Sequence, residues 1–186
     1  MGMLCIGDSN TYGYDPRGYF GGRYDDANRW VDLFAKHTGW DLRNLGSNGR
    51  QISRSGSVFS SFGQISPEDT LLIMLGTNDL LQGISAKDTS AAMDRFLSQL
   101  LPYCKNIILV VPPPMKRGSW VPSDELVRES FDLMDKYKRL AEKTGILFVD
   151  TRDWNVELAF DGVHFTEYGH HIFAQRLAEA IVTFDI

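Results

Sequence analysis

The segment Met3-Leu4-Cys5-Ile6-Gly7 is a short apolar run that ends at a glycine, and Asp8-Ser9-Asn10 follows it directly. A continuous apolar run of this length, closed by a glycine, is typical of a strand that is buried on both faces. Polar residues directly after such a strand lie at its carboxyl end, where open parallel sheets bind their ligands. This segment therefore predicts a parallel sheet with a polar site at one edge.

Strand and helix signals alternate along the rest of the chain. Apolar or β-branched runs predict four further strands, at 42–45, 70–75, 106–111 and 146–149. Helices are expected at 30–37, 86–103, 124–144 and from about 166 onward, with Ser85 and Ser123 as N-caps. The helix after Ser123 is expected to bury one stripe, made of Val127, Phe131, Met134 and Ala141.

Five apolar strands separated by helices predict the α/β class, as a three-layer α/β/α sandwich around a five-stranded parallel sheet. No repeat, low-complexity tract or linker interrupts the 186 residues. A single domain spanning 1–186 is therefore expected.

Composition excludes several classes of function. The formal net charge of −5 has the wrong sign for a protein that holds nucleic acid. No apolar run approaches the roughly 20 residues that a membrane span needs, and no secretory signal is recognisable. Cys5 and Cys104 both lie in or beside apolar segments, so buried thiols and a cytoplasmic location are expected.

Polar clusters follow the predicted strands at the same edge of the sheet. After the first strand come Asp8 and Ser9; the others are Gly46-Ser47-Asn48-Gly49, Gly76-Thr77-Asn78-Asp79 and Asp161-Gly162-Val163-His164. Together they supply a hydroxyl, an amide, exposed backbone N–H groups, a carboxylate and an imidazole. These are the groups that acyl transfer requires.

These four blocks, in this order, resemble the SGNH or GDSL-type serine hydrolase superfamily, and the resemblance covers nearly the whole chain. Trp30, the proline run 112–114 and Asp-Gly-Val-His-Phe-Thr-Glu at 161–167 are similar to its arylesterase/acyltransferase branch. The resemblance implies a flavodoxin-like SGNH fold. Asn10 stands where the family name has leucine, and we expect this difference not to affect the chemistry.

The candidate catalytic residues are Ser9, His164 and Asp161. Ser9 at a strand end is expected to be the nucleophile rather than a turn-capping serine. His164 would accept its proton, and Asp161, three residues earlier, would fix the imidazole tautomer. The alternative for the last two is an Asp-Gly turn followed by a histidine at a helix entry.

The resemblance implies an oxyanion hole made by the side-chain amide of Asn78 and the backbone N–H groups of Gly49 and Ser9. Neutral donors of fixed direction suit this role. Gly46 remains a rival to Gly49. Asp8 and Asp79 are expected to support the loops through local backbone hydrogen bonds.

Neither a metal nor a cofactor is expected. His170 and His171 lie in the last predicted helix without ligand spacing, so structural or surface roles are expected, and His37 is expected to be exposed. Trp120, Trp154 and Tyr12 are candidates for the wall of a substrate pocket, with further rings in the first loop at Tyr14, Tyr19, Phe20 and Tyr24. The alternative is that these rings only pack the loops.

The sequence thus predicts a cofactor-free esterase that acts on small-molecule, short-chain acyl esters through an acyl-enzyme, with transacylation as a further activity. Two alternatives stay open, a carbohydrate deacetylase and a non-catalytic binding domain on the same fold. The sequence is also compatible with a homo-oligomer.

Overall fold

The computed structural model describes residues 2–18, 21–53 and 69–184. Its main sheet has five strands in the order β4-β1-β5-β6-β7, and every neighbouring pair is parallel. The strands are β1 (Gly2–Gly7), β4 (Asp41–Gly46), β5 (Thr70–Met74), β6 (Asn106–Val110) and β7 (Leu147–Val149). This is the strand order of flavodoxin-like folds, in which β4 is added on one side of β1 and the later strands on the other side.

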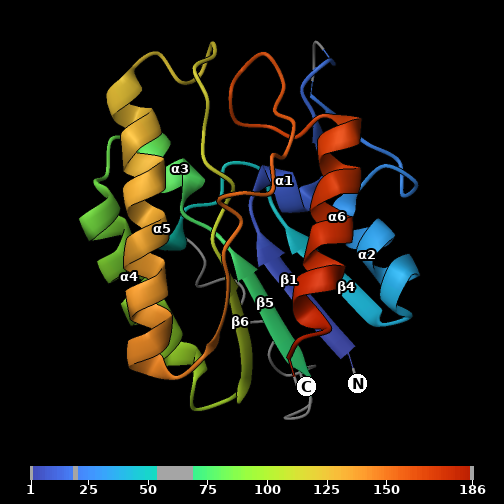
Figure 1. The fold of residues 1–186 in the computed structure, drawn as a ribbon, viewed down its shortest axis with the longest axis vertical. Coiled ribbons are helices and arrows are strands. Elements are labelled where there is room, and N and C mark those ends of the chain that lie inside the picture. The colour runs from blue at the N-terminus through green and yellow to red at the C-terminus, as the bar shows by residue number, and fades with distance from the viewer. Residues whose placement is uncertain (1, 19–20, 54–68, 185–186) are drawn as a thin grey trace.

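Helices cover both faces of this sheet, as Figure 1 shows. One face is covered by α4 (Ala86–Leu100) and α5 (Asp124–Thr144), and the other by α2 (Trp30–Thr38) and α6 (Glu167–Ile181). The predicted three-layer sandwich is therefore confirmed. Serines 85 and 123 cap α4 and α5 as expected, since each side chain accepts a backbone N–H of the first turn.

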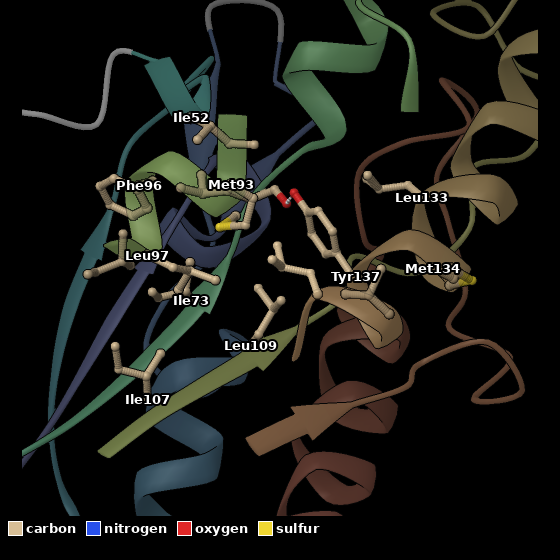
Figure 2. Packing of buried hydrophobic residues seen from close by; sticks show 14 of the residues in the cluster. Ile52, Ile73, Met93, Phe96, Leu97, Ile107, Leu109, Leu133, Met134 and Tyr137 are labelled. Atoms are coloured by element: carbon tan, nitrogen blue, oxygen red, sulfur yellow. Dashed lines mark hydrogen bonds between the residues drawn. The ribbon is translucent and has the colours of Figure 1, made fainter. Parts of the chain in front are cut away.

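Side chains of the strands alternate between two apolar clusters. Ile73, Ile107 and Leu109 point toward α4 and α5, where they pack with Met93, Leu97 and Tyr137 (Figure 2). The intervening residues Leu72, Ile108 and Val110 pack with α2 and α6 on the opposite face. Because both faces are buried, the strands read as continuous apolar runs in the sequence.

The expected buried stripe of α5 is wrong at Phe131, which is 40% exposed. The helix buries the arc that contains Leu133, Tyr137 and Leu140 instead. At about 100° per residue, Phe131 lies about 120° around the helix from Tyr137, outside that arc.

Short elements that the sequence did not predict lie at the carboxyl ends of the strands. They are α1 (Ser9–Tyr12), α3 (Thr77–Leu81) and an antiparallel ribbon of β2 (Tyr14–Asp15) and β3 (Gly22–Arg23). Elements of two to five residues carry too little periodicity to be recognised. No helix within the described ranges is long and apolar enough to cross a membrane.

Candidate active site

Ser9, His164 and Asp161 lie in one hydrogen-bonded row at the carboxyl edge of the sheet. The Ser9 Oγ lies 2.9 Å from His164 Nε2, and His164 Nδ1 lies 2.7 Å from Asp161 Oδ2. All three residues are buried, with Asp161 and His164 each 2% exposed. The structure thus brings Ser9 together with two side chains that lie more than 150 residues later in the sequence.

Asp161 is held by three hydrogen bonds. Besides the ring contact, its Oδ1 accepts the backbone N–H groups of Val163 and His164, each at 2.9 Å. Burial alone would raise the pKa of Asp161, but the hydrogen bonds from His164 and Val163 lower it below its ordinary value. The carboxylate therefore stays ionised and keeps the proton of the imidazole on Nδ1.

Ser9 is placed by the tight turn from β1 into α1. Asp8 is the N-cap of this helix, and its side chain accepts the N–H of Asn10 at 3.0 Å. A Cβ atom on Gly7 would lie 1.9 Å from Thr11 Oγ1, so the turn needs glycine at this position. The Asp8 cap and the close approach of Gly7 to Thr11 shape this turn, and from it the Ser9 side chain points toward His164.

The loop after β4 lies beside this turn. Ser47 donates its backbone N–H to the Gly7 carbonyl at 3.1 Å, and Arg50 donates to the Gly7 and Leu45 carbonyls. Arg50 thus joins the ends of β1 and β4, a role that no sequence signal indicated.

The two glycines of this loop that are oxyanion candidates differ in their backbone contacts. The Gly46 N–H already donates to Asn44 Oδ1 at 2.9 Å. Gly49 is exposed with φ of 68°, and its N–H donates to no atom in the described part of the chain. Gly49 therefore fits the expected role of a donor better than Gly46 does. Gly46 allows close approach, since a Cβ there would lie 2.2 Å from the Tyr12 nitrogen.

Asn78 and Asp79 lie in α3, directly after β5. The amide of Asn78 is half-buried and has no side-chain hydrogen bond among the residues that the structure describes. Asp79 accepts the N–H of Ile52 at 3.2 Å, which holds the chain after Arg50 against α3. Asp8 and Asp79 therefore make the backbone contacts expected of supporting residues, although that of Asp79 crosses to another loop.

The segment that carries Asp161 and His164 is fixed by its own backbone and by a neighbouring turn. Within it, Ala159 donates to the His164 carbonyl at 2.8 Å. The turn at 116–121 adds hydrogen bonds from Lys116 to the Gly162 carbonyl and from Trp120 to the Asp161 carbonyl. Gly162 has φ of 81°, and a Cβ on it would lie 2.1 Å from the Lys116 oxygen, so only glycine fits.

Two aromatic rings flank His164. The Tyr14 ring centroid lies 4.6 Å from the imidazole, and that of Trp120 lies 5.0 Å away, edge-on. Trp120 is 50% exposed, so its ring offers free surface beside the triad. This position of Trp120 is consistent with its prediction as a pocket residue. Tyr14, one of the rings of the first loop, also lies beside His164.

The other two pocket candidates lie elsewhere. Trp154 packs against Phe173 in the cluster under α2 and α6, so its assignment to the pocket is corrected to core packing. The Tyr12 ring lies 4.4 Å below the Arg23 guanidinium rather than against His164. Tyr19 and Phe20 lie outside the described residues.

The remaining histidines and the cysteines have structural surroundings. His170 is fully buried, its Nδ1 faces the Trp30 N–H at 3.3 Å, and burial lowers its pKa to about 3. His171 contacts Asn28, and His37 is exposed as expected. Cys5 and Cys104 are buried free thiols. Across residues 2–18, 21–53 and 69–184, no group of three His, Cys, Asp or Glu side chains could hold a metal ion.

A flavodoxin-like sheet with a serine, a histidine and an aspartate in a row at its carboxyl edge defines the class, a serine hydrolase that acts on esters. The chain belongs to the GDSL-like lipase/acylhydrolase family, which matches residues 5–172. A comparison with curated protein sequences gave no match.

Solved structures share the fold over almost their whole length. The native aryl esterase of M. smegmatis is similar with a TM-score of 0.84 and 25% identity, over 97% of this chain and 98% of that one. Est24, a carbohydrate acetylesterase from Sinorhizobium meliloti, has a TM-score of 0.83 at 23% identity, over 97% and 98%. A catalytic mutant of Axe2, an acetylxylan esterase from Geobacillus stearothermophilus, has a TM-score of 0.74 at 22% identity, over 97% and 95%.

Asp8 gives a pH-dependent prediction. Burial raises its pKa from 3.8 to about 6, with the Asn10 N–H and His164 opposing the shift and Asp79 adding to it. The folded state therefore binds the Asp8 proton more tightly than the unfolded state, and this contribution to stability is lost as pH rises from about 4 to about 6.

The variant Asp8→Asn keeps an acceptor for the Asn10 N–H but cannot ionise. Its free energy of unfolding relative to the native protein should increase between pH 4 and 6, by roughly 2–3 kcal/mol, and level off above about pH 7. Urea unfolding at several pH values measures it, and Asp26→Asn controls for the loss of one exposed negative charge. A difference that is independent of pH would contradict the burial argument.

Proposed function

We propose that the protein hydrolyses short-chain carboxylic esters through an acyl-enzyme on Ser9. The observation that carries this proposal is the row of hydrogen bonds from Ser9 Oγ to His164 Nε2 and from His164 Nδ1 to Asp161 Oδ2. In this row the hydroxyl, its base and the group that orients the base stand in the order that nucleophilic catalysis requires.

The reaction would begin when Ser9 Oγ attacks the ester carbonyl carbon while His164 Nε2 takes the hydroxyl proton. The Asn78 amide and the N–H groups of Gly49 and Ser9 would stabilise the negative charge on the carbonyl oxygen. His164 then returns the proton to the leaving alkoxide as the carbon–oxygen bond breaks. Water, activated by the same imidazole, hydrolyses the acyl-enzyme and regenerates Ser9.

The proposed mechanism also implies which side of the site each part of the substrate would occupy. Because His164 would protonate the leaving oxygen, the alcohol part would lie on the His164 side, where Tyr14 and Trp120 present their rings. The acyl part lies toward Gly49 and Asn78. Flat rings beside the leaving group suit an aryl or a sugar alcohol, since both stack on aromatic side chains.

A carbohydrate deacetylase is the second candidate, favoured by the exposed Trp120 ring and by the names of the neighbours Est24 and Axe2. Comparison of aryl acetates with acetylated sugars as substrates separates the two. Transacylation would follow if an alcohol reached the acyl-enzyme in place of water. The family assignment argues against the alternative of a non-catalytic binding domain.

The first test replaces the nucleophile. Ser9→Ala removes the attacking oxygen, so kcat on p-nitrophenyl acetate should fall by at least about 10³-fold. Circular dichroism should show an intact fold, because the turn depends on Gly7 and Asp8 rather than on the Ser9 hydroxyl. A folded variant that keeps most of its activity would exclude the acyl-enzyme mechanism.

The second test concerns the oxyanion. Asn78→Ala removes one donor that acts on charge developed in the transition state, so kcat should fall by about 10²-fold with KM little changed. Steady-state kinetics on the same ester measure both constants. If KM alone rises, Asn78 binds the substrate and does not stabilise the oxyanion.

The third test concerns acyl length. Each methylene that fits an apolar channel would add about 0.8 kcal/mol of binding, so a long channel predicts that kcat/KM rises with chain length. We expect the opposite, with acetyl to butyryl esters preferred, because the acyl side is bordered by the loop after β4 and by α3, which the hydrogen bond from Ile52 to Asp79 holds together. A p-nitrophenyl ester series from acetate to decanoate measures the profile.

The variant Trp120→Ala serves as the matched control for this series. It should change kcat/KM by a similar factor at every chain length, since the ring contacts the alcohol part. A maximum at octanoate or longer in the native protein would show that the acyl side is an open channel.

A further inference from the structure

The side chain of Asn10 connects the nucleophile turn to the segment that carries His164. Its Nδ2 donates to the Val163 carbonyl at 3.1 Å, and its Oδ1 accepts the Phe165 N–H at 3.0 Å. The two partners are the residues on either side of His164. One amide therefore holds both peptide units that flank the imidazole-bearing residue.

Asn10 is itself fixed close to Ser9. It is the next residue in the chain, it lies within the first turn of α1, and its backbone N–H donates to Asp8 Oδ1 at 3.0 Å. The position of Ser9 is therefore transmitted to His164 through one residue and two hydrogen bonds.

Because Asn10 is buried, the loss of either hydrogen bond would leave polar groups without a partner. Asn10 is 4% exposed, so water could not replace either partner, and each buried amide group left without one would cost free energy. The side-chain amide of asparagine supplies a donor and an acceptor from one planar group, whereas the leucine of the family name supplies neither. The expectation that Asn10 is irrelevant to the chemistry therefore conflicts with its contacts.

We propose that Asn10 is a positioning residue that sets the distance between Ser9 Oγ and His164 Nε2 by holding the backbone at Val163 and Phe165. This inference rests on the proposed function, because it needs His164 to act as the base for Ser9. The side-chain amide of Asn10 bonds to the backbone at Val163 and Phe165 and not to Ser9 Oγ or the His164 ring, so it would act through His164.

The test uses Asn10→Leu, which removes both hydrogen bonds. A displacement of the imidazole by about 1 Å is enough to cost about 10²-fold in rate, so kcat on p-nitrophenyl acetate should fall by that order while KM stays within about threefold. Asn10→Ala is made in parallel, and if the leucine variant does not fold, the same criteria apply to the alanine variant.

Thr151→Val is the matched control. It removes a different buried hydrogen bond, the 2.9 Å contact from Thr151 Oγ1 to the Val111 carbonyl, which lies at the ends of β6 and β7. It should lower the urea concentration at the midpoint of unfolding, as the loss of a buried hydrogen bond does, and leave kcat unchanged.

A double-mutant cycle with His164→Ala distinguishes positioning from a general structural effect. If Asn10 acts through His164, then Asn10→Leu should have almost no effect on the residual rate of the His164→Ala protein. An equal loss in both backgrounds would overturn the proposal, as would a native-like kcat or an effect confined to KM. If His164→Ala alone keeps native activity, the proposed function itself fails, which is a separate and recognisable result.

Discussion

Strand β1 lies between β4 and β5 in a parallel register, and the ends of these three strands place the groups of the site. Gly7 pairs with Gly46 on one side and with Met74 on the other, so the three loops leave the sheet at the same level. Backbone hydrogen bonds of a parallel sheet allow no slip of one residue without turning every side chain to the opposite face. Ser9, Gly49 and Asn78 therefore share one edge because the apolar residues of the strands fix the register.

Close backbone approach is the second constraint on this edge. Glycines at 7, 46 and 162 stand where a Cβ would overlap a neighbouring atom, and in two of these cases the neighbour is backbone from a distant segment. Side chains then bridge the loops: Arg50 binds the ends of β1 and β4, and Asp79 binds the N–H of Ile52. The site is thus held mainly by hydrogen bonds between side chains and backbone, which are directional and fix geometry more closely than apolar contacts do.

Two buried carboxylates near the nucleophile differ in how far hydrogen bonds offset the effect of burial on their pKa values. Asp161 has three donors on its two oxygens, and its pKa is lowered in spite of burial. Asp8 has the Asn10 N–H as its main donor and lies near Asp79, and its pKa is raised. The pKa values of two aspartates in one site therefore shift in opposite directions, according to how far hydrogen bonds offset the effect of burial on each.

Much of the fold and of the candidate site could be predicted from the sequence, because apolar runs and the polar residues after them are local patterns that recur along the chain. The five strands, the caps at Ser85 and Ser123, and the grouping of Ser9, Asn78, Asp161 and His164 follow from apolar runs and from the polar blocks that come after them. Tertiary structure alone decided the outcome where partners come from distant segments. Asn10 binds backbone groups more than 150 residues away, and Tyr14 and Trp120 both contact His164. Trp154 joins the core through Phe173. Phe131 lies outside the buried arc of α5. Periodicity and spacing report which elements form and where they end, but the contact of a single side chain depends on how those elements pack, and that packing is a property of the whole fold.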